Sequence, residues 1–388
     1  MILEDMILDN VRNMPPSGIR KYFDLINEMD DVISLGVGEP DFVTPWNVIE
    51  AGIYSLEKGQ THYSSNAGFV ELREEISKYL NRRFNLSYNP TDEILVTVGG
   101  SEGIDLALRA LVGPGDEVII PEPSFVAYKG CATFCGATPK IINLRVEDEF
   151  KLTAKLLKEA ITPKTKVVII PFPNNPTGAI MTKEELKEIV DVLKDKDIII
   201  LSDEIYAELS YDKEHYSIAS FSEVKDKTLV INGFSKAYAM TGWRLGYVCG
   251  HKVLIEALKK IHQYAIMCSP TTAQYAAIEA LKNGDDSVRE MAREYNRRRR
   301  ILVEGFREMG LECFEPLGAL YVFPCIKSTG MSSDEFCEKL LMEEKVLAVP
   351  GNAFGECGEG FIRACYASST EDLIEAVKRI KRFITKIS

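Results

Sequence analysis

The stretch TLVINGFSKAYAMTGWR (228–244) joins an apolar β-branched run to a segment in which one lysine stands among apolar and small residues. The run TLVI is typical of a buried strand. Lys236 follows it between Phe234 and Ala237, although lysines generally face water. Burial would lower the pKa of this amine and keep it neutral and nucleophilic. A surface lysine beyond the end of a strand is the alternative that this segment alone leaves open.

The pattern of a short apolar run followed by an amphipathic stretch repeats from about residue 90 to 250. The predicted strands are ILVTV (94–98), EVII (117–120), KVVII (166–170), DIIIL (197–201) and TLVI (228–231). Helices are expected near 101–112, 124–134 and 182–194. Continuous apolar strands separated by amphipathic helices predict the α/β class, with a mostly parallel sheet covered by helices on both faces.

The sequence changes character beyond about residue 280. A long charged helix is expected over about 284–309, and Gly310 can supply its left-handed cap. Short strands are expected near 320–324 and 361–365, and helices near 332–342 and 369–386. This alternation predicts a second, smaller α+β domain.

The first 48 residues, which include PPSGIR (15–20), fit the sheet pattern poorly and are assigned to the smaller domain. Three parts are therefore expected. They are an N-terminal arm that also completes the small domain (1–48), a large domain (49–283) and a small C-terminal domain (284–388).

Charge and cysteine content narrow the functional classes. The 388 residues include 46 Lys and Arg against 58 Asp and Glu, a formal net charge of −12. Nucleic acids and anionic membranes require a cationic surface, so neither is expected as a partner. The nine cysteines form no pattern that completes a metal site, so no metal is expected. Scattered thiols, strand-length apolar runs and an acidic start (MILEDMILDN) predict a soluble cytoplasmic protein.

Two turns that contain glycine follow predicted strands. GGSEG (99–103) opens a predicted helix, whose first backbone amides can bind a phosphate group. It lacks the GK[ST] of a nucleotide-binding loop, and a plain strand-to-helix turn is the alternative. NNPTG (174–178) favours a turn whatever its function. Asn175 would nevertheless lie at the carboxyl end of a parallel strand, where open α/β sheets bind ligands.

Two charged side chains lie at or on other predicted strands. Asp203 directly follows DIIIL and is either a helix N-cap or a charge directed into the crevice. Arg363 lies on the predicted strand of GFIRACYAS (360–368). An arginine there could bind a carboxylate through two parallel hydrogen bonds, whereas exposure to solvent is the commoner outcome for a strand arginine.

Taken together, these segments resemble the class I and II pyridoxal-phosphate-dependent aminotransferases of fold type I, specifically the aspartate and aromatic aminotransferase branch. The similarity covers nearly the whole chain. It is carried by SLGVGEPDF (34–42), THYSSNAG (61–68), GGSEG (99–103), NNPTG (174–178), SDEIY (202–206), FSKAYAMTGWRLGY (234–247), RRRR (297–300), GALYVFP (318–324), VPGNAFG (349–355) and GFIRACYAS (360–368). Their joint occurrence in this order and spacing is highly specific.

The resemblance implies pyridoxal 5'-phosphate as the cofactor and assigns the reactive groups. Lys236 matches the lysine that holds the cofactor as a Schiff base, and Asp203 matches the carboxylate that pairs with the pyridine nitrogen. Tyr206 and Asn175 match the pair that hydrogen-bonds the cofactor phenolate oxygen. Lys236, Asp203 and Tyr206 are the expected catalytic residues. Arg244, eight residues after Lys236, matches the phosphate-binding arginine.

Further matches concern the phosphate, the ring and the substrate. The other residues expected to hold the phosphate are Gly100, Ser101, Glu102 and Ser235. Phe125 matches an aromatic residue that stacks on the cofactor, and Phe125 and Asn175 are also expected to border the substrate. Gly38 and Arg363 match the residues that take the substrate α-carboxylate. Tyr63 matches a tyrosine that reaches the phosphate of the neighbouring subunit, which implies a homodimer with shared active sites.

Three positions depart from the family pattern. Gly233 stands where many relatives have a phosphate-binding serine, so Ser235 or Arg244 is expected to carry more of that task. Ser101 replaces a lysine found in some bacterial aspartate enzymes. Leu320 replaces an aromatic residue near the expected substrate mouth. The last two departures leave the choice of amino donor open.

The resemblance implies transfer of an amino group from an L-amino acid, of aspartate or aromatic type, to a 2-oxo acid, with 2-oxoglutarate the expected acceptor. Donors related to N-acetyl-diaminopimelate are an alternative within the branch. A lyase on the same scaffold, such as a cysteine-S-conjugate β-lyase or an enzyme similar to aminocyclopropane-carboxylate synthase, would share Lys236, Asp203 and Arg363. A regulator on this fold carries a DNA-binding extension, and no such pattern precedes SLGVGEP (34–40).

Overall fold

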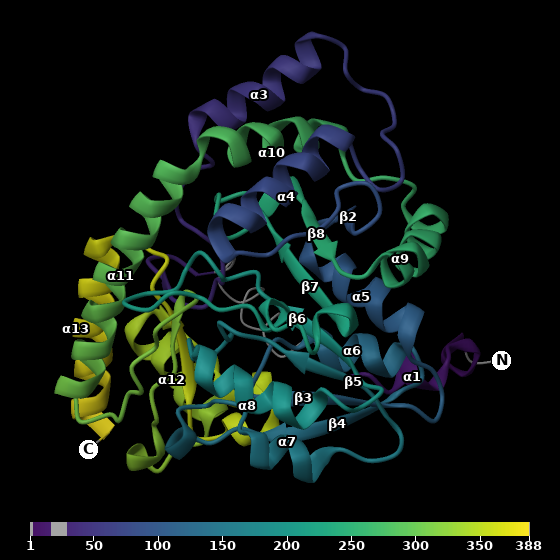
Figure 1. Ribbon diagram of the computed structural model, residues 1–388. Coiled ribbons are helices and arrows are strands. Elements are labelled where there is room, and N and C mark those ends of the chain that lie inside the picture. The colour runs from purple at the N-terminus through teal and green to yellow at the C-terminus, as the bar shows by residue number, and fades with distance from the viewer. Residues whose placement is uncertain (1–2, 17–28, 388) are drawn as a thin grey trace.

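The structure is a computed structural model that describes residues 3–16 and 29–387 (Figure 1). Residues 17–20, the larger part of the PPSGIR stretch in the expected N-terminal arm, lie outside the described residues. In the part that precedes this gap, α1 (Asp9–Arg12) lies against α6 (Ala127–Phe134). The Asn10 side-chain amide donates to the backbone carbonyls of Thr133 and Phe134, at 3.2 and 3.3 Å.

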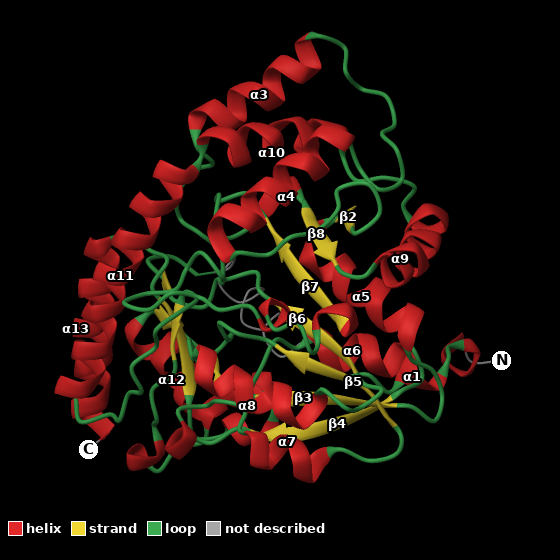
Figure 2. Ribbon diagram, in the orientation of Figure 1, coloured by secondary structure: helices red, strands yellow, loops and turns green. Residues whose placement is uncertain are grey.

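A seven-stranded sheet forms the centre of the molecule (Figure 2). In spatial order its strands are β2 (Ile94–Thr97), β8 (Gly246–Cys249), β7 (Thr228–Gly233), β6 (Ile199–Asp203), β5 (Thr165–Ile170), β3 (Glu117–Glu122) and β4 (Thr138–Asn143). Only β8 runs antiparallel to its neighbours, and the other neighbouring pairs are parallel. The predicted mostly parallel sheet is confirmed; β4 and β8 were not predicted.

Helices cover both faces of this sheet, because both faces of its strands are apolar. The helices of this part are α3 (Trp46–Glu57), α4 (Val70–Phe84), α5 (Gly99–Leu111), α6, α7 (Ala154–Ala160), α8 (Lys183–Leu193), α9 (Lys252–Ala265) and α10 (Thr271–Asn283). Successive side chains of a strand point to opposite faces of the sheet, and those of β7 illustrate this. Leu229 and Ile231 pack in one apolar cluster with α5 and α9, and Val230 packs in another with α4 and α10.

The C-terminal part contains the elements predicted beyond residue 280 and two short strands, β10 and β11, that were not predicted. They are α11 (Asp285–Glu308), β9 (Tyr321–Val322), α12 (Ser333–Glu344), β10 (Val346–Leu347), β11 (Val349–Pro350), β12 (Ile362–Cys365) and α13 (Thr370–Ile387). β11, β12 and β9 form an antiparallel sheet, and β1 (Ile33–Ser34) pairs in parallel with β10. Residues 33–34 therefore lie with the C-terminal part. Gly310, at φ +82°, ends the turn after α11 as expected.

Apolar packing joins the two parts. Tyr206 and Tyr211, which follow β6, are buried in the cluster that α11, α12 and α13 share. Phe323 and Phe361 of the C-terminal part are buried with residues of α7 and α8. The end of β5 and the segment after β6 are thereby held against the C-terminal part.

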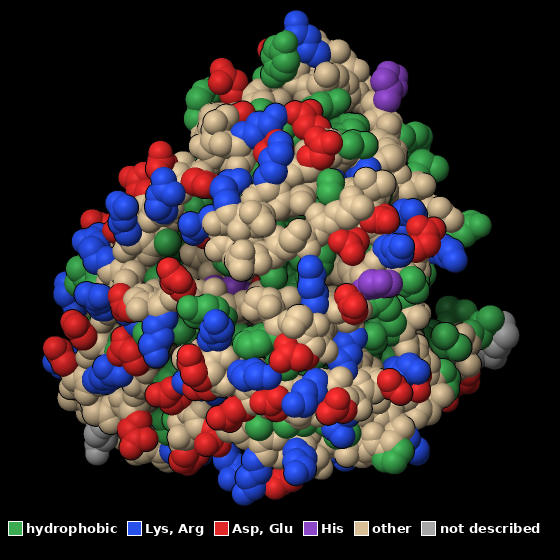
Figure 3. Space-filling model, viewed as in Figure 1, with side chains coloured by type: hydrophobic (Ala, Val, Ile, Leu, Met, Phe, Trp, Pro, Cys, Tyr) green, Lys and Arg blue, Asp and Glu red, His purple; other side chains and the backbone are tan. Residues whose placement is uncertain are grey.

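The described surface is mixed in charge. On the face shown in Figure 3, acidic and basic side chains are interspersed rather than separated into large fields. Within residues 3–16 and 29–387, no helix combines the length and the apolar character needed to cross a bilayer.

Candidate active site

A cavity of about 410 Å³ opens where the carboxyl ends of β5, β6 and β7 meet the C-terminal sheet. Ligands of open α/β sheets bind at this edge, and the volume suits a small-molecule site. Most of the residues predicted from the sequence line it. They are Gly38, Gly100, Ser101, Phe125, Asn175, Asp203, Tyr206, Ser235, Lys236, Arg244 and Arg363. Residues from segments more than 300 positions apart are thus brought to one place.

Lys236 lies inside the cavity, three residues beyond the end of β7. Its Nζ donates to the carbonyl oxygen of Gly38 at 2.6 Å and lies 5.8 Å from the centre of the Tyr206 ring. Burial lowers the pKa of Lys236 to about 8, because little water remains to solvate the ammonium form. The interpretation of Lys236 as a surface lysine is therefore wrong.

Asp203 ends β6 and is buried. The Tyr128 hydroxyl donates to its Oδ2 at 2.7 Å, and the Ile205 backbone amide donates to its Oδ1 at 3.2 Å. Burial raises the pKa of Asp203, although these two bonds favour the carboxylate. Within the described residues no cation forms an ion pair with Asp203. A positively charged ring nitrogen would supply the charge that this buried acid lacks.

The opposite end of the cavity has the features of an anion site. Gly100 and Ser101 lie in the first turn of α5, a helix of 13 residues whose first amides have no partner within the helix. Gly99, at φ +74°, lets Arg244 approach: a Cβ on Gly99 would lie 2.7 Å from an Arg244 guanidinium nitrogen. Ser235 adds a hydroxyl to the lining. These groups fit a phosphate.

Glu102 does not line this cavity. Its Oε1 lies 2.6 Å from Nδ1 of the fully buried His262 on α9, and its Oε2 accepts the backbone N–H of Val98. Glu102 was expected among the phosphate-binding residues, and its side chain is engaged by His262 and Val98 instead. The Glu102 carboxylate stabilises the turn by bonding to Val98 and His262. Only the backbone amide of Glu102 remains for a phosphate. Sequence analysis missed His262, which carries no signal beyond its place in an amphipathic helix.

The family's serine position is closed to a side chain here. A Cβ on Gly233 would lie 2.9 Å from Gly246 Cα and 3.0 Å from the Leu245 carbonyl oxygen. Strand β8 approaches β7 too closely at this point to admit a side chain without a backbone shift. The absence of a serine at Gly233 thus has a steric reason, and Ser235 and Arg244 remain as the candidate phosphate groups nearby.

Arg363 is buried on β12, so the alternative of an exposed strand arginine is wrong. Its Nη1 donates to Asn175 Oδ1 at 2.9 Å, and its Nη2 donates to the Gly36 carbonyl at 2.6 Å. Its buried Nε has no hydrogen-bond partner in the described residues. The guanidinium carbon lies 4.4 Å from the Tyr321 ring centre and 4.7 Å from that of Phe354. A buried cation between two rings at a cavity wall suits a carboxylate ligand.

Tyr206 and Tyr321 meet across the cavity. Their hydroxyl oxygens are 2.7 Å apart, and burial raises the pKa of both phenols. Sequence analysis singled out Tyr206 but not Tyr321, which lies within the quoted GALYVFP segment. It named Leu320 in the same segment as a residue near the substrate mouth. That expectation is wrong, because Leu320 is fully buried in the apolar cluster of the C-terminal part.

Two aromatic residues remain. Phe125 is half-buried in the cavity wall and makes an edge-on contact with Tyr128, with ring centres 5.7 Å apart. Tyr63 is 80% exposed and is not part of the lining within the chain. In the described residues, no group of three or more His, Cys, Asp or Glu side chains is placed to hold a metal ion.

This set of residues agrees with the comparisons to known proteins. The family described as aminotransferase class I and II matches residues 30–380. The chain belongs to that family. It is 55% identical to a putative aminotransferase, YugH, of Bacillus subtilis strain 168, over 97% of this chain and 98% of the relative.

Other aminotransferases are similar over the same length. An aspartate aminotransferase of Pyrococcus abyssi is 44% identical over 97% of both chains. The solved structure of an aromatic aminotransferase from Pyrococcus horikoshii OT3 is 43% identical, with a TM-score of 0.90 over 94% of this chain and 99% of that one. The α/β fold predicted from the sequence, with its resemblance to fold-type-I enzymes, is confirmed, and the protein is an aminotransferase.

Proposed function

We propose that this aminotransferase uses pyridoxal 5'-phosphate, held by Lys236, to move an amino group from an L-amino acid to a 2-oxo acid. Relatives named for aspartate and for aromatic amino acids support donors of those two types. 2-Oxoglutarate is the acceptor that we expect. The observation that carries the proposal is one cavity that contains an amine of lowered pKa, a buried acid without a cationic partner and a buried arginine.

The residues divide the work by position. Pyridoxal phosphate, when bound, supplies the electron sink that makes the α-proton of an amino acid acidic. Asp203 would keep the ring nitrogen protonated by pairing with it. Tyr206 and Asn175 would hydrogen-bond the phenolate oxygen, and Phe125 would stack on the ring. Since Asn175 Oδ1 already accepts from Arg363, its Nδ2 is the atom left to donate.

Phosphate and substrate would be held at opposite ends. The groups proposed for the phosphate are the backbone amides of Gly100, Ser101 and Glu102 and the side chains of Ser101, Ser235 and Arg244. Arg363 would bind the substrate α-carboxylate beside Gly38, which fixes the α-carbon near Lys236. Once displaced by the substrate, the Lys236 amine would carry the proton from the α-carbon, work that typically contributes about 10²–10⁴-fold.

Absorbance of the purified protein tests this function. A visible band that bleaches with a single amino acid and returns with 2-oxoglutarate is the expected result. Lys236→Ala should abolish the band, whereas Lys339→Ala, at an exposed site on α12, should keep it. Irreversible bleaching with release of ammonia or pyruvate would identify a lyase instead. Borohydride reduction that labels a residue other than Lys236 would disprove the assignment.

We further propose a homodimer with shared active sites, in which Tyr63 reaches the partner's phosphate. The side chain of Tyr63 is exposed, as a residue that completes another subunit's site must be in an isolated chain. Exposed Trp46 and Tyr54 on α3 offer apolar surface for such contact. Nine free thiols suit a reducing compartment, so we place the dimer in the cytoplasm.

Subunit mixing tests the shared site. Tyr63→Ala and Lys236→Ala proteins should each have low activity, for different reasons. A mixture that exchanges subunits should regain activity, because each hybrid dimer contains one site with both native residues. No recovery in hybrids that form, as measured with differently tagged subunits, would contradict the role of Tyr63.

A further inference from the structure

Tyr321 contacts three groups of the site at once, although it was not predicted as a site residue. Its hydroxyl lies 2.7 Å from that of Tyr206 and 3.4 Å from the carbonyl oxygen of Gly38. Its ring lies under the Arg363 guanidinium at 4.4 Å. The same Gly38 carbonyl accepts the Lys236 amine at 2.6 Å. One side chain therefore links the groups proposed for the cofactor and for the substrate carboxylate.

The distances favour one direction for the hydrogen bond between the two phenols, in which either oxygen could donate. An O–H···O bond is normally about 2.7–2.8 Å long, so Tyr321 bonds well to Tyr206 and only weakly to Gly38. The Tyr321 hydroxyl is therefore better placed to donate to the Tyr206 oxygen than to Gly38. Tyr206 then keeps its own proton for an acceptor in the cavity.

The electrostatic surroundings favour the same direction. Burial raises the pKa of Tyr321 to about 12, a rise that the neighbouring Arg363 cation limits. Burial raises the pKa of Tyr206 as well. The Arg363 guanidinium lies directly against the Tyr321 ring, and a nearby cation makes a phenol the better donor. This geometry favours Tyr321 as the donor of the pair.

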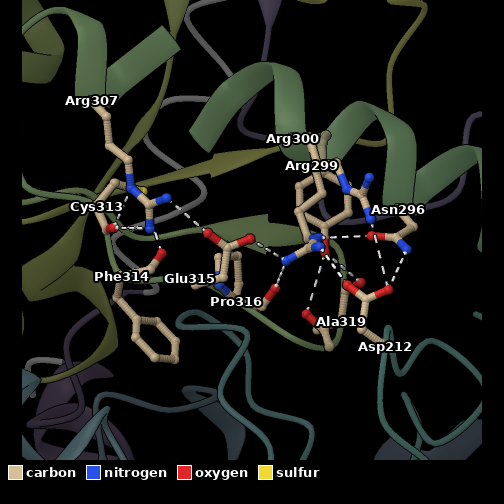
Figure 4. A network of polar contacts seen from close by, with 12 residues as sticks. Asp212, Asn296, Arg299, Arg300, Arg307, Cys313, Phe314, Glu315, Pro316 and Ala319 are labelled. Carbon is tan, nitrogen blue, oxygen red and sulfur yellow. Dashed lines mark hydrogen bonds and ion pairs between the residues drawn. The ribbon is translucent and has the colours of Figure 1, made fainter. Parts of the chain in front are cut away.

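The turn that carries Tyr321 is fixed from several sides (Figure 4). The buried Arg299 of α11 donates to the Pro316 carbonyl at 2.7 Å. The Tyr211 hydroxyl donates to the Ala319 carbonyl at 2.6 Å, and the Tyr366 hydroxyl donates to the same atom at 2.9 Å. Ala319 has the unusual φ of +59°, which these contacts hold in place. The position of the Tyr321 ring is therefore set by the fold.

We propose that Tyr321 is a positioning residue for the transamination site. Its hydroxyl directs the Tyr206 proton into the cavity, toward the cofactor phenolate oxygen, and its ring supports Arg363 in the orientation that receives the carboxylate. This inference rests on the proposed function. It assigns separate tasks to the two ends of one side chain, so the tasks can be separated by substitution.

Tyr321→Phe tests the hydroxyl. The ring stays beneath Arg363, and Tyr206 loses the donor that orients and strengthens its own hydrogen bond. We expect the pH midpoint of the visible band of the cofactor-loaded protein to rise by about half a unit to one unit, the size of one neutral hydrogen bond. We also expect kcat to fall about 2- to 10-fold, with KM for the amino acid unchanged.

Tyr321→Leu tests the ring. It should show the same spectral shift and, in addition, raise KM for the amino acid about tenfold, because Arg363 loses its contact with the aromatic face. The dissociation constant of a simple carboxylate inhibitor such as succinate should rise in parallel. That binding measurement does not depend on turnover.

Tyr366→Phe is the matched control. It removes a buried hydroxyl that binds the same turn at Ala319 but does not contact Tyr206. Because the Tyr211 hydroxyl still holds the Ala319 carbonyl, the turn should keep its place, and the spectral midpoint should equal that of the wild type. An unchanged midpoint in Tyr321→Phe, or an equal shift in Tyr366→Phe, would overturn the role of Tyr321. Absence of any visible band in the wild type would instead refute the proposed function, so the two failures are distinguishable.

Discussion

Lys236 shows how burial changes the chemistry of a single residue. At its usual pKa, about three amines in ten thousand would be neutral at pH 7, whereas a pKa near 8 leaves about one in ten. Asp203 is shifted in the opposite direction by the same physical cause, because burial disfavours charge on either group. A ligand that offers an aldehyde and a cationic ring nitrogen would relieve both costs.

The titration of Lys236 can be measured without cofactor. Competitive labelling of the cofactor-free protein with trace acetic anhydride should give a midpoint at about pH 8 for Lys236, because the neutral amine alone reacts. Exposed Lys339 serves as the internal reference, with the usual midpoint of an exposed lysine, above 10. A Lys236 midpoint equal to that of the reference would show that the cavity does not desolvate the amine.

At the scale of elements, the start of α5 depends on another helix. Glu102 closes the turn by accepting the Val98 amide, and His262 of α9 holds the carboxylate from behind. Gly100 and Ser101, in the first turn of α5, line the cavity. The sequence motif predicted the turn. The contact that holds Glu102 in it comes from His262, which is 160 residues away in the sequence.

Removal of His262 should destabilise this arrangement. His262→Leu removes the side-chain hydrogen-bond partner of the largely buried Glu102 carboxylate, a loss of about 1.5–3 kcal/mol in the free energy of unfolding. The double substitution with Glu102→Leu should cost less than the sum of the two single changes. Urea unfolding of the cofactor-free protein measures these values.

His251 on the same helix gives the comparison for His262. It is the N-cap of α9, and His251→Ala removes one cap bond, which costs about 1 kcal/mol. Equal losses of unfolding free energy in His262→Leu and His251→Ala would mean that the contact of His262 with Glu102 stabilises the fold no more than an ordinary cap bond. Pyridoxal phosphate affinity should fall with His262→Leu and stay unchanged with His251→Ala.

At the scale of the whole molecule, Arg299 joins α11 to two segments that are far apart in the sequence (Figure 4). Its guanidinium is bound by Asp212 at 3.0 Å, by Glu315 at 2.6 Å and by the Pro316 carbonyl. Asp212 follows the Tyr206 segment, and Pro316 precedes the turn of Tyr321. Arg299 therefore connects the segments that carry Tyr206 and Tyr321 to α11.

Arg299→Met should lower the free energy of unfolding much more than Arg300→Met does. Asp212 and Glu315 are half exposed and regain water, so the expected loss for Arg299→Met is that of its charged hydrogen bonds and the buried Pro316 carbonyl, about 2–3 kcal/mol. Arg300 is 57% exposed and 3.8 Å from Asp212, so its removal should cost about 0.5 kcal/mol or less. Urea denaturation of both variants measures the two losses. Similar midpoints would show that Arg299 does not stabilise the fold through Asp212, Glu315 and Pro316.

The sequence predicted the elements with strong local patterns. The strands at 117–122, 165–170 and 228–233 and the helix at 285–308 lie within a few residues of their expected positions. β8 was not predicted, because GYVC (246–249) is short and its antiparallel place between β2 and β7 depends on strands far away. The motifs also gave most of the candidate site residues that line the cavity, because their joint order and spacing match the family, although each segment alone left an alternative open.

By itself, the sequence determined the fold class, the family and the candidate site residues, because apolar periodicity and motif order can be read directly from the chain. The tertiary structure alone decided which way those side chains face. It turned Glu102 away from the cavity toward His262, buried Leu320 in the core and brought Tyr321 against Tyr206. Such outcomes depend on packing between distant segments, and no local pattern contains that information.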